Sequence, residues 1–484
     1  MMNVVGKSYG NAAFAAVSLL LTLAAFALGA RGDVQHQSFK AFYCAGVAVR
    51  ERHDPYRVEP LRSCERGLER DAMPAGYVEP APLPGYVLLP FAILSKLPPK
   101  LAAEIFCISL ALAAIVSARF LAAPTNASAT GILLAFAPLT LLNVAYGETA
   151  PFAMLAICAA AYFLTKHRWI AAGCAASLAV LQPNVGVPAV VAMFLFVHRS
   201  RAAVIVSVAA LALLSLAALG VAENKEYFAQ VLPSMAYAEL VASDQYSLSR
   251  LLFVAGVSPP LALLLGKIWF ACAAVFGVVL AGVLSARNRQ DILVPLLPPA
   301  AVLFFGVYLH DIQILIALPA AVAIASRVPA RMFRAIGTAA LGLLIAVWTQ
   351  KISRTTIALD FAGVFGGLVA VLGGSLGRRL TVASIGAAAT TLCVVLLVHV
   401  QPGPTAGEIV THAFSAAPDE LSPVAWARYL RATAALTRPT FAPQLAAWLG
   451  LLGLLVTAVA AALRPSRTRA SLPAQDQARP ILIA

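Results

Sequence analysis

The sequence has few charged residues and none of the short motifs that mark common soluble enzymes. Only 12% of its 484 residues are Asp, Glu, Lys or Arg, whereas 61% are hydrophobic. Soluble domains carry about 25% charged residues, so the composition excludes a soluble globular protein. The sequence also has no GxxxxGK[ST] phosphate loop, no GxGxxG turn after a strand, no HExxH helix and no zinc spacing of Cys and His. These absences exclude the commonest nucleotide- and metal-dependent soluble enzymes.

Hydrophobic runs recur along the chain, many of them near the length that a helix needs to cross the ~30 Å core of a bilayer. The first run covers 11–30. We expect further spans at 100–120, 129–146, 149–165, 168–182, 184–198, 201–221, 259–286, 292–309, 311–327, 333–349, 355–374, 380–400 and 441–463. The sequence therefore predicts an all-α polytopic membrane protein with about 12–14 transmembrane helices.

Residues 83–97 are apolar but too short to cross the bilayer, because a fifteen-residue helix reaches only about 22 Å. We expect an interfacial helix here, and this choice sets the sidedness of every later loop. With it, basic side chains gather in one set of short loops, which hold Arg119, Lys166, Arg168, Arg199, Arg201, Arg287, Arg289, Arg327, Arg331, Arg334, Arg378, Arg379, Arg464, Arg467 and Arg469. Positive loops face the cytoplasm, so we expect a multi-pass protein of the cell membrane with both termini inside.

This topology divides the chain into five parts. We expect a first transmembrane helix at 1–30, an extracytoplasmic loop with interfacial helices at 31–99, a transmembrane core at 100–327, C-terminal transmembrane helices at 328–463 and a cytoplasmic basic tail at 464–484. Segments 222–258 and 401–440 are also expected outside. Because the net charge of +14 lies largely in the cytoplasmic loops, membrane lipids are expected partners and nucleic acid is not.

The loop 31–99 is too polar to cross a bilayer, yet it is rich in aromatic residues. It also contains Cys44 and Cys64. An extracytoplasmic loop allows a disulfide between them, and two free thiols are the alternative. The other five cysteines lie within apolar runs and are expected as small core residues, namely Cys107, Cys158, Cys174, Cys272 and Cys393.

Polar residues at the expected span ends fall on one face, the extracytoplasmic one. They are Asp33, Glu79, Glu148, Gln182, Asn184, Asp244, Gln245, Ser247, His310 and Asp311. Each of them alone also fits an ordinary polar residue at the membrane surface. Their convergence on one face favours a functional site, since ionisable groups near membrane depth are costly.

Such a face suits group transfer from a lipid-phosphate donor. A carboxylate can take a proton from an acceptor hydroxyl, and cations can hold the donor phosphate. The candidate phosphate partners in the loop are Lys40, Arg50, Arg52, Arg57 and Arg62. The alternative is that these arginines are solvated or paired with the nearby Glu51, Asp54, Glu59 and Glu65.

Several stretches together resemble glycosyltransferase family 87, a family of the GT-C superfamily. They are SFKAFYCAG (38–46), HDPY (53–56), PAPLPGYVLLPFAIL (80–94), YGETAPF (146–152), AAGCAASLAVLQPNVGVP (171–188), DQYSLSRLL (244–252) and HDIQILIALP (310–319). The resemblance implies a GT-C-like helix bundle that moves a sugar such as mannose from a polyprenyl-phosphate donor to a lipid or cell-envelope glycan outside. It requires no cofactor, and we predict metal independence because the sequence has no tight carboxylate cluster.

Three positions depart from the family pattern. The family's aspartate falls on Ser38, its glutamine on Glu148 and its lysine on Gln182. A serine cannot act as the base at neutral pH, so we expect the catalytic carboxylate among Asp33, Glu79 and Glu148, in that order. The predicted donor- and acceptor-binding residues are Lys40, Tyr43, Arg50, Arg52, Tyr56, Gln182, Asn184, Gln245, His310 and Asp311.

Two other functions fit parts of the pattern. A transporter or lipid flippase would also be polytopic, but the sequence shows no inverted repeat with paired broken helices. A non-catalytic member of the same family would explain Ser38 at the aspartate position. The sugar, the acceptor and the inverting or retaining outcome stay open.

Overall fold

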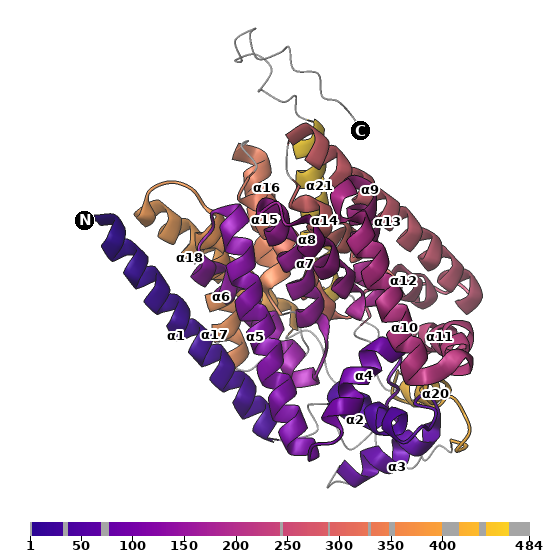
Figure 1. Cartoon of the computed structure of the whole chain (residues 1–484). Coiled ribbons are helices and arrows are strands. Elements are labelled where there is room, and N and C mark those ends of the chain that lie inside the picture. The colour runs from indigo at the N-terminus through magenta and orange to yellow at the C-terminus, as the bar shows by residue number, and fades with distance from the viewer. Residues whose placement is uncertain are drawn as a thin grey trace.

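The structure is a computed structural model that describes residues 2–31, 37–68, 77–242, 245–288, 291–327, 331–347, 354–398, 416–434 and 442–463. Within these ranges the protein is a bundle of helices without a β-sheet (Figure 1). The all-α prediction is therefore confirmed. The expected tail 464–484 and most of 401–440 lie outside the described residues.

The first half of the bundle follows the hydrophobic runs closely. Its helices are α1 (Met2–Arg31), α2 (Gln37–Arg50), α3 (Val58–Leu68), α4 (Gly85–Leu94), α5 (Pro99–Thr125), α6 (Ala129–Tyr146), α7 (Ala150–Thr165), α8 (Trp169–Ser177), α9 (Pro183–Phe196) and α10 (Arg201–Glu226). A 3-10 turn, Leu178–Leu181, links α8 to α9, and Pro183 begins α9 because proline is tolerated in the first helical turn.

The second half adds shorter helices at the centre and longer ones outside. They are α11 (Leu232–Ala238), α12 (Leu248–Val254), α13 (Pro259–Asn288), α14 (Leu293–Val302), a 3-10 helix (Asp311–Ala317), α15 (Leu318–Ala325), α16 (Arg331–Ile345), α17 (Arg354–Val371), α18 (Leu376–Val398), α20 (Ser422–Ala434) and α21 (Ala442–Leu463). All ten residues of α14 are buried, which places this helix inside the bundle.

Seven helices of the described residues are long and apolar enough to cross a membrane, fewer than the 12–14 expected. The other predicted spans are present as shorter apolar helices, such as Ala150–Thr165, Pro183–Phe196 and Leu293–Val302. A ten-residue helix covers about 15 Å, half of the bilayer core. The helices α7 and α9 match the expected ranges 149–165 and 184–198 within two residues, whereas α14 ends well before the expected limit at 309.

The polar N-terminal loop folds into helices at one end of the bundle. Figure 1 shows α2, α3 and α4 at the lower end of the view, with α20 beside them. Backbone hydrogen bonds attach the residues before α20 to the start of α3: Val58 N–H donates to Glu420 O (2.8 Å) and Glu59 N–H to Pro418 O (2.9 Å). Two segments more than 350 residues apart in sequence thus form one cap.

Helix α4 is ten residues long, and its expected place at the membrane surface stays a prediction. It packs closely against α2 at Gly46. A Cβ atom at Gly46 would lie 2.8 Å from Ala92 N and closer still to the Phe91 carbonyl, so only glycine lets the two backbones approach.

The segment 222–258, which is expected outside the membrane, contains regular structure. The segment 222–258 is mostly helical: α10 bends at Gly220 (φ 77°) and continues to Glu226, and a π-helical turn then leads to α11. The expected span end near 221 marks this bend rather than the end of the helix.

The five unpaired cysteines also divide differently from the expectation. Cys107 and Cys158 are buried, whereas Cys174, Cys272 and Cys393 are exposed on the outside of the bundle. An apolar run places a cysteine on a membrane helix but does not tell which side of that helix faces the protein.

We expect Gly46→Ala to destabilise the protein, because the methyl group would overlap the α4 backbone, and overpacking of this kind costs about 1–3 kcal/mol. The measurement is the unfolding temperature of the purified protein in detergent. Gly67→Ala on α3 is the matched control, since nothing lies within 4 Å of a Cβ there. An unchanged unfolding temperature for Gly46→Ala would contradict this packing.

Candidate functional site

An irregular stretch between α14 and the 3-10 helix organises the polar groups of the bundle. Residues 303–310 are not helical, and Phe305 and Tyr308 have positive φ angles of 59° and 55°. Unwound backbone at membrane depth is tolerated where it is buried in protein or lines a cavity, because its polar groups need partners. Here side-chain amides supply some of them: Asn184 Nδ2 donates to Tyr308 O (2.9 Å) and Gln245 Oε1 accepts from Leu309 N–H (3.0 Å).

A row of buried amides connects this stretch to the start of α7. Gln182 Nε2 donates to Thr149 Oγ1 (2.7 Å), and Gln313 Nε2 donates to Gln182 Oε1 (3.1 Å). Gln313 Oε1 in turn accepts from His310 N–H (3.2 Å). Gln182 and Gln313 are 7% and 4% exposed, so these hydrogen bonds are shielded from bulk water.

The row continues through Gln245 to a carboxylate. Gln245 Nε2 lies 2.9 Å from His310 Nε2 and donates to Glu239 Oε2 at 2.9 Å. His310 Nε2 and Glu239 Oε2 are themselves 3.6 Å apart. Three predicted residues, Gln182, Gln245 and His310, therefore belong to one hydrogen-bonded row, which runs from Thr149 to Glu239 and which we call the amide row.

Glu79 lies in the non-helical segment 77–84 of the cap, near the other end of the amide row. Ser38 Oγ on α2 donates to Glu79 Oε1 (3.5 Å), and Tyr77 O–H donates to Glu79 Oε2 (3.4 Å). The Glu79 backbone N–H donates to Glu65 Oε2 on α3 (3.1 Å). The charge of Glu148, next to Thr149 in sequence, acts on Glu79. Glu79 and Glu148 are thus close enough for the charge of one carboxylate to act on the other.

Burial and the negative charge of Glu148 raise the pKa of Glu79 to about 8. Hydrogen bonds from Tyr77 and Ser38 and the charge of Lys40 act in the opposite direction but do not outweigh them. A carboxyl group in apolar surroundings beside a second carboxylate favours its neutral form. A carboxyl with a pKa near neutral pH is suited to exchange a proton with a substrate.

Other predicted residues have structural partners instead. Tyr56 is 1% exposed and donates to Leu83 O (2.8 Å), and Tyr43 donates to Leu97 O (2.9 Å). Arg50 contacts Ser95 and Glu51, and Arg52 is exposed at a turn with φ 61°. Asp311 Oδ1 accepts the N–H of Ile312 (2.8 Å) at the start of the 3-10 helix.

Asp33 and Asp244 lie outside the described residues. Arg57 pairs with Asp54 (2.9 Å) and Glu226, and Arg62 pairs with Glu59 (2.8 Å). With Arg50, which pairs with Glu51, these contacts support the alternative that most loop arginines are bound by neighbouring carboxylates. Among the candidate phosphate partners, Lys40 is the one whose charge acts on Glu79.

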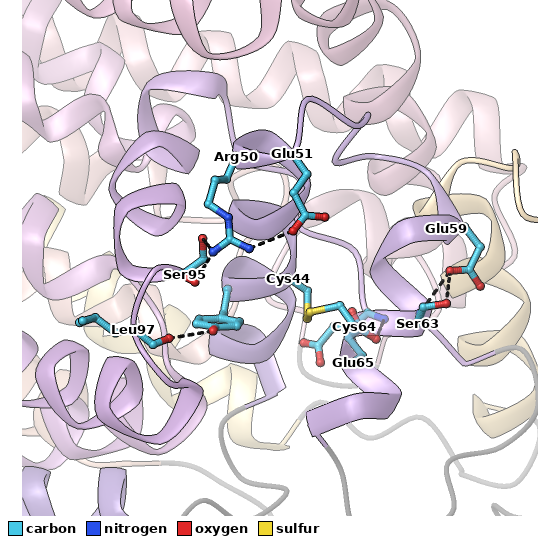
Figure 2. Close-up of a disulfide and its surroundings, with 11 residues drawn as sticks. Cys44, Arg50, Glu51, Glu59, Ser63, Cys64, Glu65, Ser95 and Leu97 are labelled. Atoms are coloured by element: carbon cyan, nitrogen blue, oxygen red, sulfur yellow. Dashed lines mark hydrogen bonds and ion pairs between the residues drawn. A yellow bond between two sulfur atoms is a disulfide. The ribbon is translucent and has the colours of Figure 1, made fainter.

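The structure contains a disulfide between Cys44 on α2 and Cys64 on α3 (Figure 2). Figure 2 shows Glu65 beside this bond and the Glu59–Ser63 contact on a different side of α3. The disulfide therefore joins the helix that carries Ser38 to the helix that carries Glu65.

Several residues of the site escaped the sequence analysis, namely Glu65, Tyr77, Thr149, Glu239 and Gln313. Gln313 lies three residues after His310, a spacing that a helical turn brings together, and this signal could have identified it. Glu239 is a single carboxylate at the end of an otherwise apolar helix. It was not named because the sequence analysis treated 222–258 as an outside loop.

A second feature is an apolar groove of about 710 Å³ between α13, α14, α16 and α21. Trp269, Phe276, Phe304 and Phe333 line it. A chain of aromatic contacts leads from it to the amide row. Phe304 lies 4.7 Å from Phe305, and Phe305 lies 4.5 Å from Trp448, measured between ring centroids. Trp448 Nε1 donates to the backbone carbonyl of Tyr246, next to Gln245 (3.1 Å).

In the part of the chain that the structure describes, no group of three or more His, Cys, Asp or Glu side chains gathers in a way that could hold a metal ion. The predicted metal independence stays a prediction, because the reaction itself has not been observed.

Comparison with protein families gives one match. The model of glycosyltransferase family 87 matches residues 84–307. This range includes Glu148, Gln182 and Gln245 and excludes Ser38 and Glu79. Searches of curated proteins and of solved structures return no match to this chain.

The raised pKa of Glu79 predicts a pH-dependent stability. Its ordinary value is 4.5, so between about pH 4.5 and 8 the folded protein holds a proton that the unfolded chain releases. The stabilising contribution is complete below about pH 4.5 and is lost as the pH rises through about 8. In Glu79→Gln the unfolding temperature should therefore change less with pH between pH 6 and 9 than in the unchanged protein. The measurement is the unfolding temperature in detergent across this range.

Glu59→Gln is the control for this measurement. Burial raises the pKa of Glu59, but hydrogen bonds from Ser63 and Arg62 outweigh it and lower the pKa overall. Its contribution therefore changes only at acid pH, and the curve between pH 6 and 9 should match that of the unchanged protein. Identical curves for Glu79→Gln and Glu59→Gln would contradict the raised pKa of Glu79.

Proposed function

Because residues 84–307 form a glycosyltransferase family 87 domain, we propose that this glycosyltransferase takes a sugar from a polyprenyl-phosphate donor. The acceptor is a lipid or cell-envelope glycan at the extracytoplasmic face of the membrane. The observation that carries the proposal is the position of Glu79, whose carboxylate lies beside the Ser38 hydroxyl. Ser38 stands where the family pattern has an aspartate, and Glu79 places a carboxylate at that point from another part of the chain.

In the proposed reaction Glu79 acts as the general base. Its carboxylate takes the proton of the acceptor hydroxyl while the acceptor oxygen forms a bond to the anomeric carbon of the sugar. The bond from that carbon to the donor phosphate oxygen breaks, and polyprenyl phosphate leaves with the electron pair. A base whose pKa is near 8 is deprotonated in a usable fraction at neutral pH and holds the proton well once it has taken it.

Positive and polar groups near Glu79 suit the phosphate of the donor. Lys40, two residues after Ser38 in α2, supplies a positive charge that acts on the base. The amide row supplies His310, which would orient the phosphate or the acceptor. A fixed cation near a departing phosphate stabilises the negative charge that develops on it.

The apolar groove supports a lipid-linked donor over a soluble nucleotide sugar. Its lining is almost entirely apolar, and the aromatic contacts from Phe304 to Trp448 border the amide row at one end. An isoprenoid chain in this groove would keep its phosphate near His310. Burial of about 25 cal/mol per Å² of apolar surface would give such a chain a substantial part of the binding energy.

The disulfide supports the extracytoplasmic placement. Disulfides persist in oxidising compartments and are rare in the cytosol. The Cys44–Cys64 bond lies in the same cap as Glu79, so an oxidising environment for the bond implies the same side of the membrane for the carboxylate.

We expect Glu79→Gln to lower kcat by about 10²- to 10⁴-fold, the usual contribution of a general base. The assay follows transfer of radiolabel from polyprenyl-phosphate mannose, and then from other polyprenyl-phosphate sugars, to extracted lipid or glycan by the purified protein. Glu59→Gln in the same cap should retain activity, since Glu59 pairs with Arg62 away from the site. Full activity of Glu79→Gln would remove Glu79 as the base, and substrate uptake into proteoliposomes without chemistry would instead favour a transporter.

The pH dependence of kcat/KM should rise through a limb near pH 8, because the base must be deprotonated. Glu148→Gln removes the negative charge that raises the Glu79 pKa, so the limb should move to lower pH. The measurement is kcat/KM from pH 6 to 9 for both proteins. A limb that stays in place or moves to higher pH would show that Glu148 does not act on the base.

A further inference from the structure

We propose that Glu65, held in place by the Cys44–Cys64 disulfide, is a positioning residue that fixes the Glu79 carboxylate at the site. The proposal rests on the proposed role of Glu79 as the base and adds the device that holds it. Neither Glu65 nor the two cysteines lie in the range that the family model matches, 84–307.

Glu79 needs a contact that holds its position because its own backbone has no regular structure. The segment 77–84 belongs to neither a helix nor a strand. In regular structure the backbone N–H is held by a helix or sheet ladder, and here the Glu65 carboxylate takes that place: Glu79 N–H donates to Glu65 Oε2 at 3.1 Å. This hydrogen bond ties the irregular segment to α3 at the position of Glu79.

Glu65 is itself fixed by its surroundings. It is only 5% exposed and lies on the buried side of α3 together with Val58 and Leu61. A buried polar atom is costly without a hydrogen bond, so the contact from the Glu79 N–H helps to keep Glu65 Oε2 in this place. Its neighbour Cys64 is covalently tied to α2, which limits how α3 can move or turn (Figure 2).

Together these contacts close a ring around the base. The disulfide runs from Cys64 to Cys44, α2 runs back from Cys44 to Ser38, and Ser38 Oγ donates to Glu79 Oε1. The backbone of Glu79 then returns to Glu65, next to Cys64. Glu79 is thus held from both sides, its carboxylate by α2 and its backbone by α3, and the covalent bond sets the distance between those two helices.

The first experiment compares two substitutions at one position. Glu65→Gln keeps an oxygen that accepts the Glu79 N–H, whereas Glu65→Leu keeps the approximate size and removes the acceptor. We expect Glu65→Leu to lower kcat about 100-fold, as a misplacement of about 1 Å can do, and to change the pH limb of kcat/KM, while the KM for the donor changes little. Glu65→Gln should restore most of the activity and the limb of the unchanged protein.

Glu59→Leu, on the same helix, is the matched control for general damage to α3, because its carboxylate contacts Arg62 and Ser63 instead of Glu79. It should retain the kcat and pH limb of the unchanged protein. Glu65→Leu with unchanged kcat and pH limb would overturn the proposal, and so would an equal loss in Glu59→Leu and Glu65→Leu.

The second experiment tests the disulfide and covers the case in which Glu65→Leu does not fold. Reduction of the purified protein with dithiothreitol, and the double substitution Cys44→Ser with Cys64→Ser, should each lower kcat and shift the pH limb in the same direction as Glu65→Leu. Size-exclusion elution in detergent reports whether the protein stays folded. A reduced, folded protein with unchanged kcat and pH limb would show that the bond does not position the base.

The two proposals can fail separately. If the unchanged protein transfers no sugar from any polyprenyl-phosphate donor, the proposed function fails. The pH dependence of the unfolding temperature still reports the Glu79 pKa in that case, and Glu65→Leu should shift it while Glu59→Leu does not. If transfer occurs but Glu65→Leu behaves like Glu59→Leu in both measurements, the positioning role fails and the transferase stands.

Discussion

The side chain of Gln182 links the start of α7 to the 3-10 helix Asp311–Ala317 by hydrogen bonds. Its amide donates to Thr149 at the start of α7 and accepts from Gln313 in the 3-10 helix, so one residue ties the two halves of the site together. A buried amide is costly unless both of its ends are satisfied, and here both are. Gln182 is a neutral residue whose oxygen and nitrogen both have hydrogen-bond partners inside the protein. The unwound stretch 303–310 leads directly into the 3-10 helix that carries Gln313.

Much of the fold could be predicted because hydrophobic length is a direct consequence of bilayer thickness. The predicted spans at 129–146 and 259–286 match α6 and α13 within a few residues. The lengths of the helices were predicted less well where contacts with distant parts of the chain accompany the end of a helix. Val302 ends α14 although the apolar run continues to 309, and in the irregular stretch that follows, Leu309 N–H donates to Gln245 Oε1. Apolar composition does not encode such a break, and a positive φ at Phe305 cannot be read from a phenylalanine.

The site was predicted in part for a similar reason. Glu79, Glu148, Gln182, Gln245 and His310 could be named because polar residues at span ends are rare and easily noticed. Glu65 could not, since it looked like one more charge in a charged loop, and its burial depends on how α3 packs. Tyr43 and Tyr56 were named because they stand in conspicuous motifs, and the structure shows that each donates a hydrogen bond to a backbone carbonyl of the cap. A motif thus marks positions that a fold requires as well as those that a reaction requires.

Cys272 is exposed and lines the apolar groove, whereas Cys107 and Cys158 are covered by neighbouring helices. This difference gives the groove a natural attachment point for a small fluorescent or spin label once Cys174 and Cys393 have been replaced. A reporter there would sense whether a hydrophobic molecule fills the space beside Trp269 and Phe276, at a distance from the carboxylates. Occupancy of the apolar groove and the reaction at the carboxylates could then be followed as two signals from the same molecule.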